Sequence, residues 1–184
     1  MPLNIPSGST NNISFGPAKV YLGAAGSTPS TDVGFITEDG VTIEVSSERR
    51  DIMQGNPKLI EYTFSQTQGV MINFTSIEWN FDNFAAILGA GQTTSGGGSD
   101  TFSFGGDPLT TSYALHIEHA MAVTGNTMNV YAWKVVAEAG LSAPLGSDEH
   151  QFPAAFKCQR VSTDWAGSSL DYRSQLIKFV RVTA

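Results

Sequence analysis

Two histidine-containing clusters, HIEH at 116–119 and SDEH at 147–150, carry the side chains most suited to chemistry. Imidazole and carboxylate groups at short spacing are common ligands of zinc and other transition metals. On an extended strand, however, His116 and Glu118 point to one side and His119 points to the other, so the first cluster offers only two ligands on a face. We therefore interpret both clusters as solvated polar segments and predict no metal site.

Motifs that would indicate an enzyme are missing from the sequence. There is no GxxxxGK[ST] phosphate loop, no GxGxxG and no GxSxG nucleophile elbow. The glycine-rich SGGGSD stretch has neither a lysine nor a following amphipathic helix. The single cysteine, Cys158, excludes an internal disulfide, and its place in AFKCQRV favours a packed thiol over a nucleophile. We predict no catalytic residue and no cofactor.

The composition describes one globular domain over residues 1–184, with many turns. The chain is 41% hydrophobic and has 19 glycines and 8 prolines. Its net charge of −7 argues against gripping nucleic acid through phosphate contacts. No apolar run approaches the length of a membrane span. Residues 1–12 lack a basic residue and an apolar block, so we expect a flexible N-terminal arm and not a signal peptide.

Alternation of apolar and polar residues dominates the chain and predicts half-buried antiparallel strands. In VTIEVS (41–46), IEYTFS (60–65) and VMINFT (70–75), apolar side chains alternate with small polar or acidic ones. We expect further strands at 17–22, 112–119, 128–138, 153–161 and 174–182. The polar sides of the first three strands form one predicted wet face: Thr42, Glu44, Ser46, Glu61, Thr63, Ser65, Asn73 and Thr75.

One helix is predicted at about 80–89, within NFDNFAAILGAG. Asn80 is a candidate N-cap and Gly89 a candidate for the position after the last helical turn. Helical spacing places four apolar residues on one stripe, which we expect to pack on the sheet: Phe81, Phe84, Ala85 and Leu88. The stretch that follows, 91–100, is predicted to be a flexible Gly/Ser-rich loop.

The densest charge lies between two strand patterns. Six of the fourteen residues from Glu48 to Glu61 are charged, in a chain that is 15% charged overall. A long hairpin loop is expected at about 46–59. Charges at this density on a projecting loop favour contact with a neighbouring molecule.

Several stretches resemble the tail tube protein (major tail protein) of long-tailed bacteriophages. NISFGPAKVYLG resembles the start of that family, and DVGFITEDGVTIEVS resembles its early hairpin. DIMQGNPKLIEYTFSQTQGVMINFTSIEWNFDNFAAILGAG resembles its long loop, its paired strands and its passage from strand to helix. These stretches cover roughly residues 13–91, and residues 92–184 carry strands but no motif of the family.

The resemblance implies an antiparallel β-sandwich or barrel-like domain with one flanking helix. It further implies six-membered rings that stack into a hollow tube through which DNA leaves the capsid, an architecture shared with the type VI secretion tube protein. In the family the long hairpin loop reaches the adjacent ring. Its counterparts here are Arg49, Arg50, Asp51, Gln54, Gly55, Asn56 and Lys58.

Further expectations follow from the same resemblance. The partners would be other copies of the chain, together with tape measure, tail terminator and distal tail proteins. The protein would be made in the cytoplasm of a bacterial host and reside in the virion. The wet face would line the bore, where DNA passes without specific binding, although an ordinary solvated outer face remains an alternative.

Two other functions remain open at this point. The first is a monomeric, jelly-roll-like module that binds carbohydrate or another ligand. Trp79, Trp133 and Trp165 are the aromatic platforms it would use, although Trp79 and Trp133 lie in alternating apolar patterns typical of a core. The second is a small β-barrel enzyme or ligand carrier, for which the sequence offers no site.

Overall fold

The computed structural model describes residues 16, 18–106, 110–122, 125–138, 140–143, 146 and 150–183. The N-terminal arm predicted at 1–12, and residues 147–149 of the second histidine cluster, lie outside the described residues. The described chain is mainly β, with antiparallel sheets and one α-helix, which confirms the predicted fold class. Its elements are β1 (Lys19–Ala24), β2 (Thr31–Asp32), β3 (Ile36–Gln54), β4 (Leu59–Ser76), α1 (Phe81–Leu88), β5 (Gln92–Gly96), β6 (Ser99–Ser103), β7 (Ser112–Ala120), β8 (Thr127–Ala137), β9 (Phe152–Cys158), a 3₁₀ turn (Tyr172–Ser174) and β10 (Lys178–Val182).

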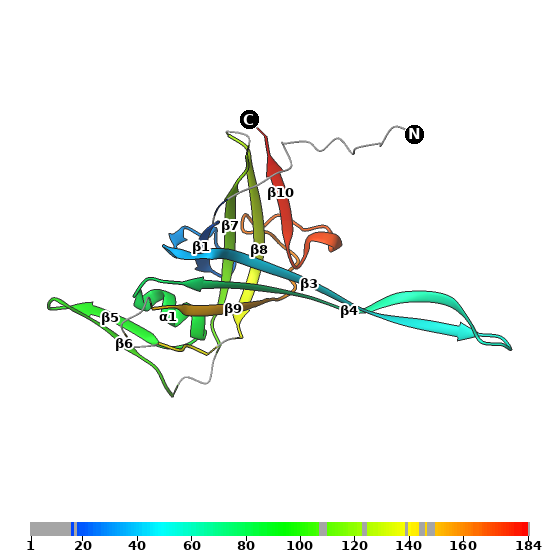
Figure 1. Ribbon diagram of the computed structural model, residues 1–184, viewed down its shortest axis with the longest axis horizontal. Helices are drawn as coiled ribbons and strands as arrows, with labels where there is room; N and C mark the ends of the chain where they lie inside the picture. Colours follow the sequence, from blue (N-terminus) through cyan, green and yellow to red (C-terminus); the bar gives the residue numbers. More distant parts are fainter. Residues whose placement is uncertain are drawn as a thin grey trace, which may run out of the picture.

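An eight-stranded antiparallel sheet forms the body of the molecule: seven strands follow the order β2-β1-β7-β8-β9-β4-β3, and the eighth, β10, pairs with β8. Strand β8 is where the sheet divides, because residues 127–131 pair with β10 and residues 135–137 pair with β9. In Figure 1, β7, β8 and β10 run upright while β3, β4 and β9 cross them. The sheet thus folds over itself into two crossed layers that can enclose a core.

The apolar side chains of both layers meet in one core. Val20, Leu115 and Ile117 come from β1 and β7, and Ile72 and Phe156 come from β4 and β9. All five are almost completely buried. The alternation predicted for 70–75 is confirmed here, because its apolar members are buried and its polar members are half-exposed. Burial of this apolar surface is the main stabilising term for such a domain.

Helix α1 has the predicted ends. The Asn80 side chain accepts hydrogen bonds from the backbone N–H groups of Asp82 (2.9 Å) and Asn83 (3.4 Å). At the other end Gly89 adopts φ 65°, and its N–H donates to the Ala86 carbonyl at 3.1 Å. A left-handed residue here favours glycine because it avoids a clash with Cβ.

The buried face of α1 is rotated from the predicted stripe. Phe84 is buried as expected, but Phe81, Ala85 and Leu88 are only half-buried. The other buried positions are Asn83, Ala86 and Ile87. The reason is a second layer of contacts, because β5 and β6 also pack against the helix and the Phe81 and Phe102 rings lie 6.2 Å apart.

The prediction of a flexible loop at 91–100 is wrong. Residues 92–103 form the β5–β6 hairpin, with Gly96 paired with Ser99. Gly97 (φ 62°) and Gly98 (φ 82°) form its two-residue turn. Positive φ at both central residues suits a tight hairpin, so the glycines serve the turn here and do not act as a linker.

Strands β3 and β4 are much longer than predicted. The predicted strands 60–65 and 70–75 are parts of one continuous strand, β4, and the expected loop at 46–59 is mostly strand. Only residues 55–58 turn, between Gln54 and its partner Leu59. The two strands leave the body of the molecule and extend far to one side (Figure 1).

Candidate assembly surface

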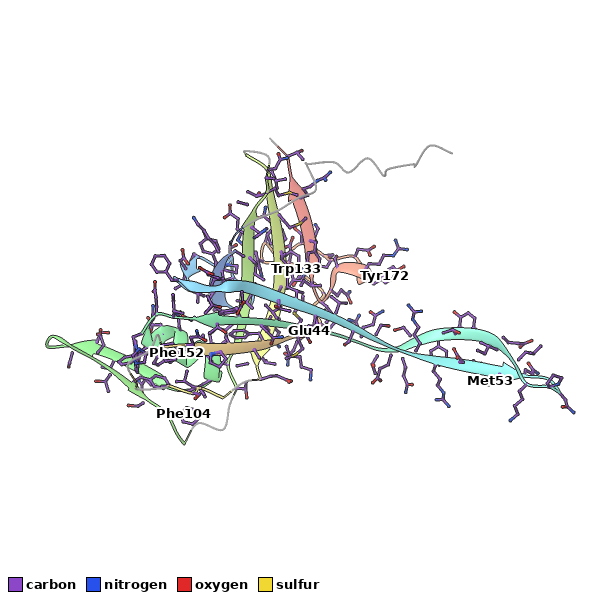
Figure 2. The ribbon with its side chains drawn as sticks, in the orientation of Figure 1. Glu44, Met53, Phe104, Trp133, Phe152 and Tyr172 are labelled. Carbon is purple, nitrogen blue, oxygen red and sulfur yellow. The ribbon has the colours of Figure 1, made fainter. Side chains whose placement is uncertain are left out.

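The extension of β3 and β4 is the most distinctive feature of the molecule. The pairing of β4 with β9 ends at Met71 and Lys157, so beyond it β3 and β4 pair only with each other. We call residues 46–69 the arm. Side chains project from both of its faces (Figure 2), and all but two of its residues are exposed, Phe64 and Gly69 being intermediate. An isolated two-stranded ribbon in water is marginally stable, so such an arm gains from contact with another surface.

Two β-bulges interrupt the pairing within the arm. Glu48 pairs with Thr67, but the next residue, Arg49, pairs with Ser65, which leaves Gln66 as an extra residue. A second shift lies between Ile52 and Met53 and makes Glu61 the extra residue. A bulge changes which face of the ribbon the following side chains occupy.

The bulges separate the predicted wet face into two groups. Thr42, Glu44 and Ser46 share the outer face of the sheet with Asn73 and Thr75, because Thr42 pairs with Asn73. Ser65 instead shares the opposite face with Ser47, since their hydroxyl oxygens lie 2.8 Å apart.

Thr63 and Glu61 also depart from the predicted face. Thr63 lies on the same face as Ser65, because its hydroxyl donates to the Asp51 carboxylate at 2.6 Å. Glu61 is unpaired in the second bulge. A single wet face containing all eight residues is therefore wrong, and the extra residues of the bulges are the reason.

The arm exposes large apolar side chains. Leu59 is 66% exposed, Tyr62 63% and Ile60 58%, and Ile52 and Met53 are about half exposed. The strand pattern at 60–65 was predicted to be half-buried, and that is wrong, because only Phe64 in it is partly covered. Clustered exposed apolar residues on an otherwise water-facing projection indicate a binding surface.

The sequence offered one signal for these residues. Between the strand patterns at 41–46 and 60–65, the turn-forming residues cluster at Gly55, Asn56 and Pro57. A strand of 19 residues is far longer than a small core requires. Part of it therefore has to extend beyond the body.

The charges predicted for the loop lie mainly on strands. Arg49, Arg50 and Asp51 belong to β3 in the middle of the arm, whereas Lys58 lies in the turn. Neither arginine forms an ion pair with another described residue. Their guanidinium groups are therefore available to a partner surface.

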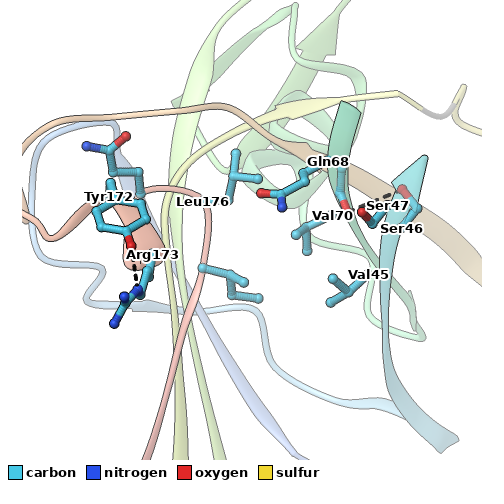
Figure 3. A pocket seen from close by; sticks show the side chains of 11 residues that line it. Val45, Ser46, Ser47, Gln68, Val70, Tyr172, Arg173 and Leu176 are labelled. Atoms are coloured by element: carbon cyan, nitrogen blue, oxygen red, sulfur yellow. Dashed lines mark hydrogen bonds between the residues drawn. The ribbon is translucent and has the colours of Figure 1, made fainter. Parts of the chain in front are cut away.

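A groove opens at the base of the arm (Figure 3). It has a volume of about 380 Å³ and is bounded by the first arm residues and by the chain around the 3₁₀ turn. Val45 and Val70 line one side, and Leu176 and Ile177 line the other. The groove is thus an apolar site at the point where the arm leaves the core.

A second, polar pocket of about 470 Å³ lies between the start of α1 and the β5–β6 hairpin. Glu78, Asp82 and Asp100 contribute carboxylates, and Trp79 contributes a ring. Trp79 was expected in the core, but it is 49% exposed. Only part of its ring is covered, by edge contacts with Phe84 and Phe152. Trp133, by contrast, is buried as predicted.

His116 and Cys158, which were considered as candidates for chemistry, are packed against neighbouring side chains. The His116 ring stacks on Tyr131 at 5.0 Å, and its Nε2 lies 2.9 Å from the Asn129 side-chain oxygen. No group of three or more His, Cys, Asp or Glu residues in the described part of the chain could hold a metal ion. Cys158 is buried, and this burial raises the pKa of its thiol to about 12. The thiol is therefore protonated at neutral pH, as expected of a packed residue.

Comparisons with known proteins add no relative to this picture. No protein-family model matches the chain, and a search of curated proteins likewise finds no match. Among the helices within the described residues, none has the length and hydropathy to cross a bilayer.

Proposed function

We propose that the protein is a structural subunit that assembles with copies of itself into stacked, six-membered rings forming the hollow tail tube of a long-tailed phage. The observation that carries this proposal is the arm, a projecting ribbon with exposed apolar side chains and unpaired arginines. A monomer gains nothing from such a surface, whereas an assembling subunit uses it to contact the next copy. The resemblance of residues 13–91 to tail tube proteins supports the same function.

A second feature fits a tube subunit. The outer face of β3 and β4 presents hydroxyl, amide and carboxylate groups from Thr42, Glu44, Ser46, Asn73 and Thr75. If this face lined the bore, the Glu44 carboxylates of all subunits would repel phosphate. DNA would then pass without binding. Within a virion, tape measure, tail terminator and distal tail proteins would be the other partners.

Assembly of the purified protein tests the proposal. We expect electron microscopy and sedimentation to detect rings or tubes, with growth that depends on protein concentration. A protein that stays monomeric over a wide range of concentration and salt, and in the presence of tail-initiating proteins, contradicts the proposed function.

The polar pocket supports a second candidate, a monomeric binding module. A half-exposed Trp79 beside Asp82 and Asp100 resembles the combination of ring and hydrogen-bond acceptors that holds a sugar. Binding of a soluble oligosaccharide to the monomer, lost on Trp79→Ala, would favour this candidate. Assembly that is unaffected by Trp79→Ala would favour the tube.

A further inference from the structure

We propose that the groove at the base of the arm receives the arm tip of a second copy of the same chain. This inference rests on the proposed function, and it names the surface on the neighbouring subunit that the arm occupies. The argument uses the shape of the arm, the apolar lining of the groove and one pair of opposite charges.

The arm cannot fill the groove of its own chain. Seven residues of β3, from Glu48 to Gln54, lie between the groove residue Ser47 and the turn, and an extended strand rises about 3.3 Å per residue. The tip therefore lies roughly 23 Å from the groove of its own subunit. Any contact between the two surfaces has to be made between different copies.

The two surfaces match in chemistry. The groove is lined by Val45, Val70, Leu176 and Ile177 at a volume of about 380 Å³. That space suits a few side chains and not a folded domain. The arm tip presents Ile60 and its pairing partner Met53, which share one face of the ribbon and are each more than half exposed. Seating them in the groove removes apolar surface from water on both partners.

A charge pair would fix the register. On the rim of the groove, the Arg173 guanidinium lies over the Tyr172 ring at 5.0 Å from its centroid, and Arg173 Nε donates to the Tyr172 hydroxyl at 2.8 Å. This holds the cation in place. On the arm, Glu61 is exposed in the second bulge, directly beside Ile60. Neither residue forms an ion pair with another described residue.

The contact joins unlike surfaces, arm to groove. Each subunit has one of each, so each copy can give its arm to one neighbour and accept the arm of another. Such a heterologous contact repeats without closing unless rotation brings the series back on itself. It therefore provides a way to add subunits along a stack.

Charge exchange tests the pairing of Glu61 with Arg173. Glu61→Arg and Arg173→Glu each bring like charges together, so each should raise the protein concentration at half-assembly by about tenfold. The double variant restores opposite charges and should assemble as the wild type does. Lys19→Glu, an exposed position on β1, changes net charge as Arg173→Glu does and should have little effect. A double variant no better than the single ones overturns the pairing.

Cysteine cross-linking tests the location directly. One preparation carries Met53→Cys on the arm tip and the other Gln175→Cys on the groove rim, and the two are mixed under oxidising conditions. The Cys158 thiol is buried and protonated, so it should not form a disulfide with either introduced cysteine. We expect a covalent dimer from this mixture, and none when Gln175→Cys is replaced by Ser99→Cys, at the start of β6.

The outcomes separate the two proposals. If wild-type protein assembles but Met53→Cys links to Ser99→Cys and not to Gln175→Cys, the groove is the wrong receptor while the proposed function stands. If wild-type protein stays monomeric under every condition and no mixture cross-links, both proposals are wrong.

Discussion

Replacing Phe84 by alanine tests how much the packing of α1 against the sheet contributes to stability. Phe84 is 3% exposed and its ring lies 4.7 Å from that of Phe152 and 5.6 Å from that of Trp79. Removing a buried phenylalanine costs about 3–5 kcal/mol, since it loses transfer free energy and leaves a cavity. Domains of this kind have a free energy of unfolding of about 5–15 kcal/mol, so the loss is a large fraction of the total.

Thermal unfolding followed by circular dichroism measures the effect. At this chain length each kcal/mol lowers the melting temperature by about 2–4 °C, so Phe84→Ala should lower it by roughly 6–20 °C. Phe35→Ala is the matched control, because Phe35 is 72% exposed and its loss should change stability by less than about 0.5 kcal/mol. Equal melting temperatures for the two variants would show that α1 does not bury Phe84 against the sheet.

Three further predictions concern the arm, the thiol and the outer face. Arg49→Glu with Arg50→Glu should leave the melting temperature unchanged, because both side chains are exposed, yet reduce assembly measured by sedimentation; normal tubes would show that the arm arginines take no part in assembly. Because burial raises the pKa of Cys158 from 9.0 to about 12, the folded protein holds a proton that the unfolded chain loses. Stability conferred by this group is present below pH 9 and falls as the pH rises toward 12, by up to about 1.4 kcal/mol per pH unit. Urea unfolding should therefore depend less steeply on pH in Cys158→Ala, and equal slopes contradict the assignment. Glu44→Lys should fold normally and make assembled particles retain double-stranded DNA in a salt-dependent manner; particles that still exclude DNA would remove the outer face from the bore.

Local signals in the sequence were sufficient for most elements of secondary structure. The caps of α1 depend on side chains within a few residues of one another, so Asn80 and Gly89 define the helix without reference to the rest of the fold. The same is true of the alternation in 70–75, which directly reflects burial of one side of β4. Short-range physics of this kind is present in the amino-acid order itself.

The rotation of α1 and the hairpin at 92–103 required the tertiary structure. Phe81 contacts Phe102, which lies on the β5–β6 hairpin. The composition of 91–100 had predicted a flexible loop in place of this hairpin. A run of glycines is compatible with either a linker or a tight turn. The choice depends on whether the flanking residues find a partner, and here β5 and β6 pair with each other against the helix.

The sequence by itself determined that 41–46, 60–65 and 70–75 are strands, that a hairpin connects the first two, and that this connection is rich in charge. Only the tertiary structure decided that the pairing of β4 with β9 ends at Met71, so that the rest of the hairpin projects as an arm. Only pairing decided that Gln66 and Glu61 are bulge residues. Side chains alternate between the two faces of a strand, so a single extra residue reverses the faces of all the residues that follow it. The alternation along one strand depends on that strand alone, whereas the position of a bulge depends on how two strands pair.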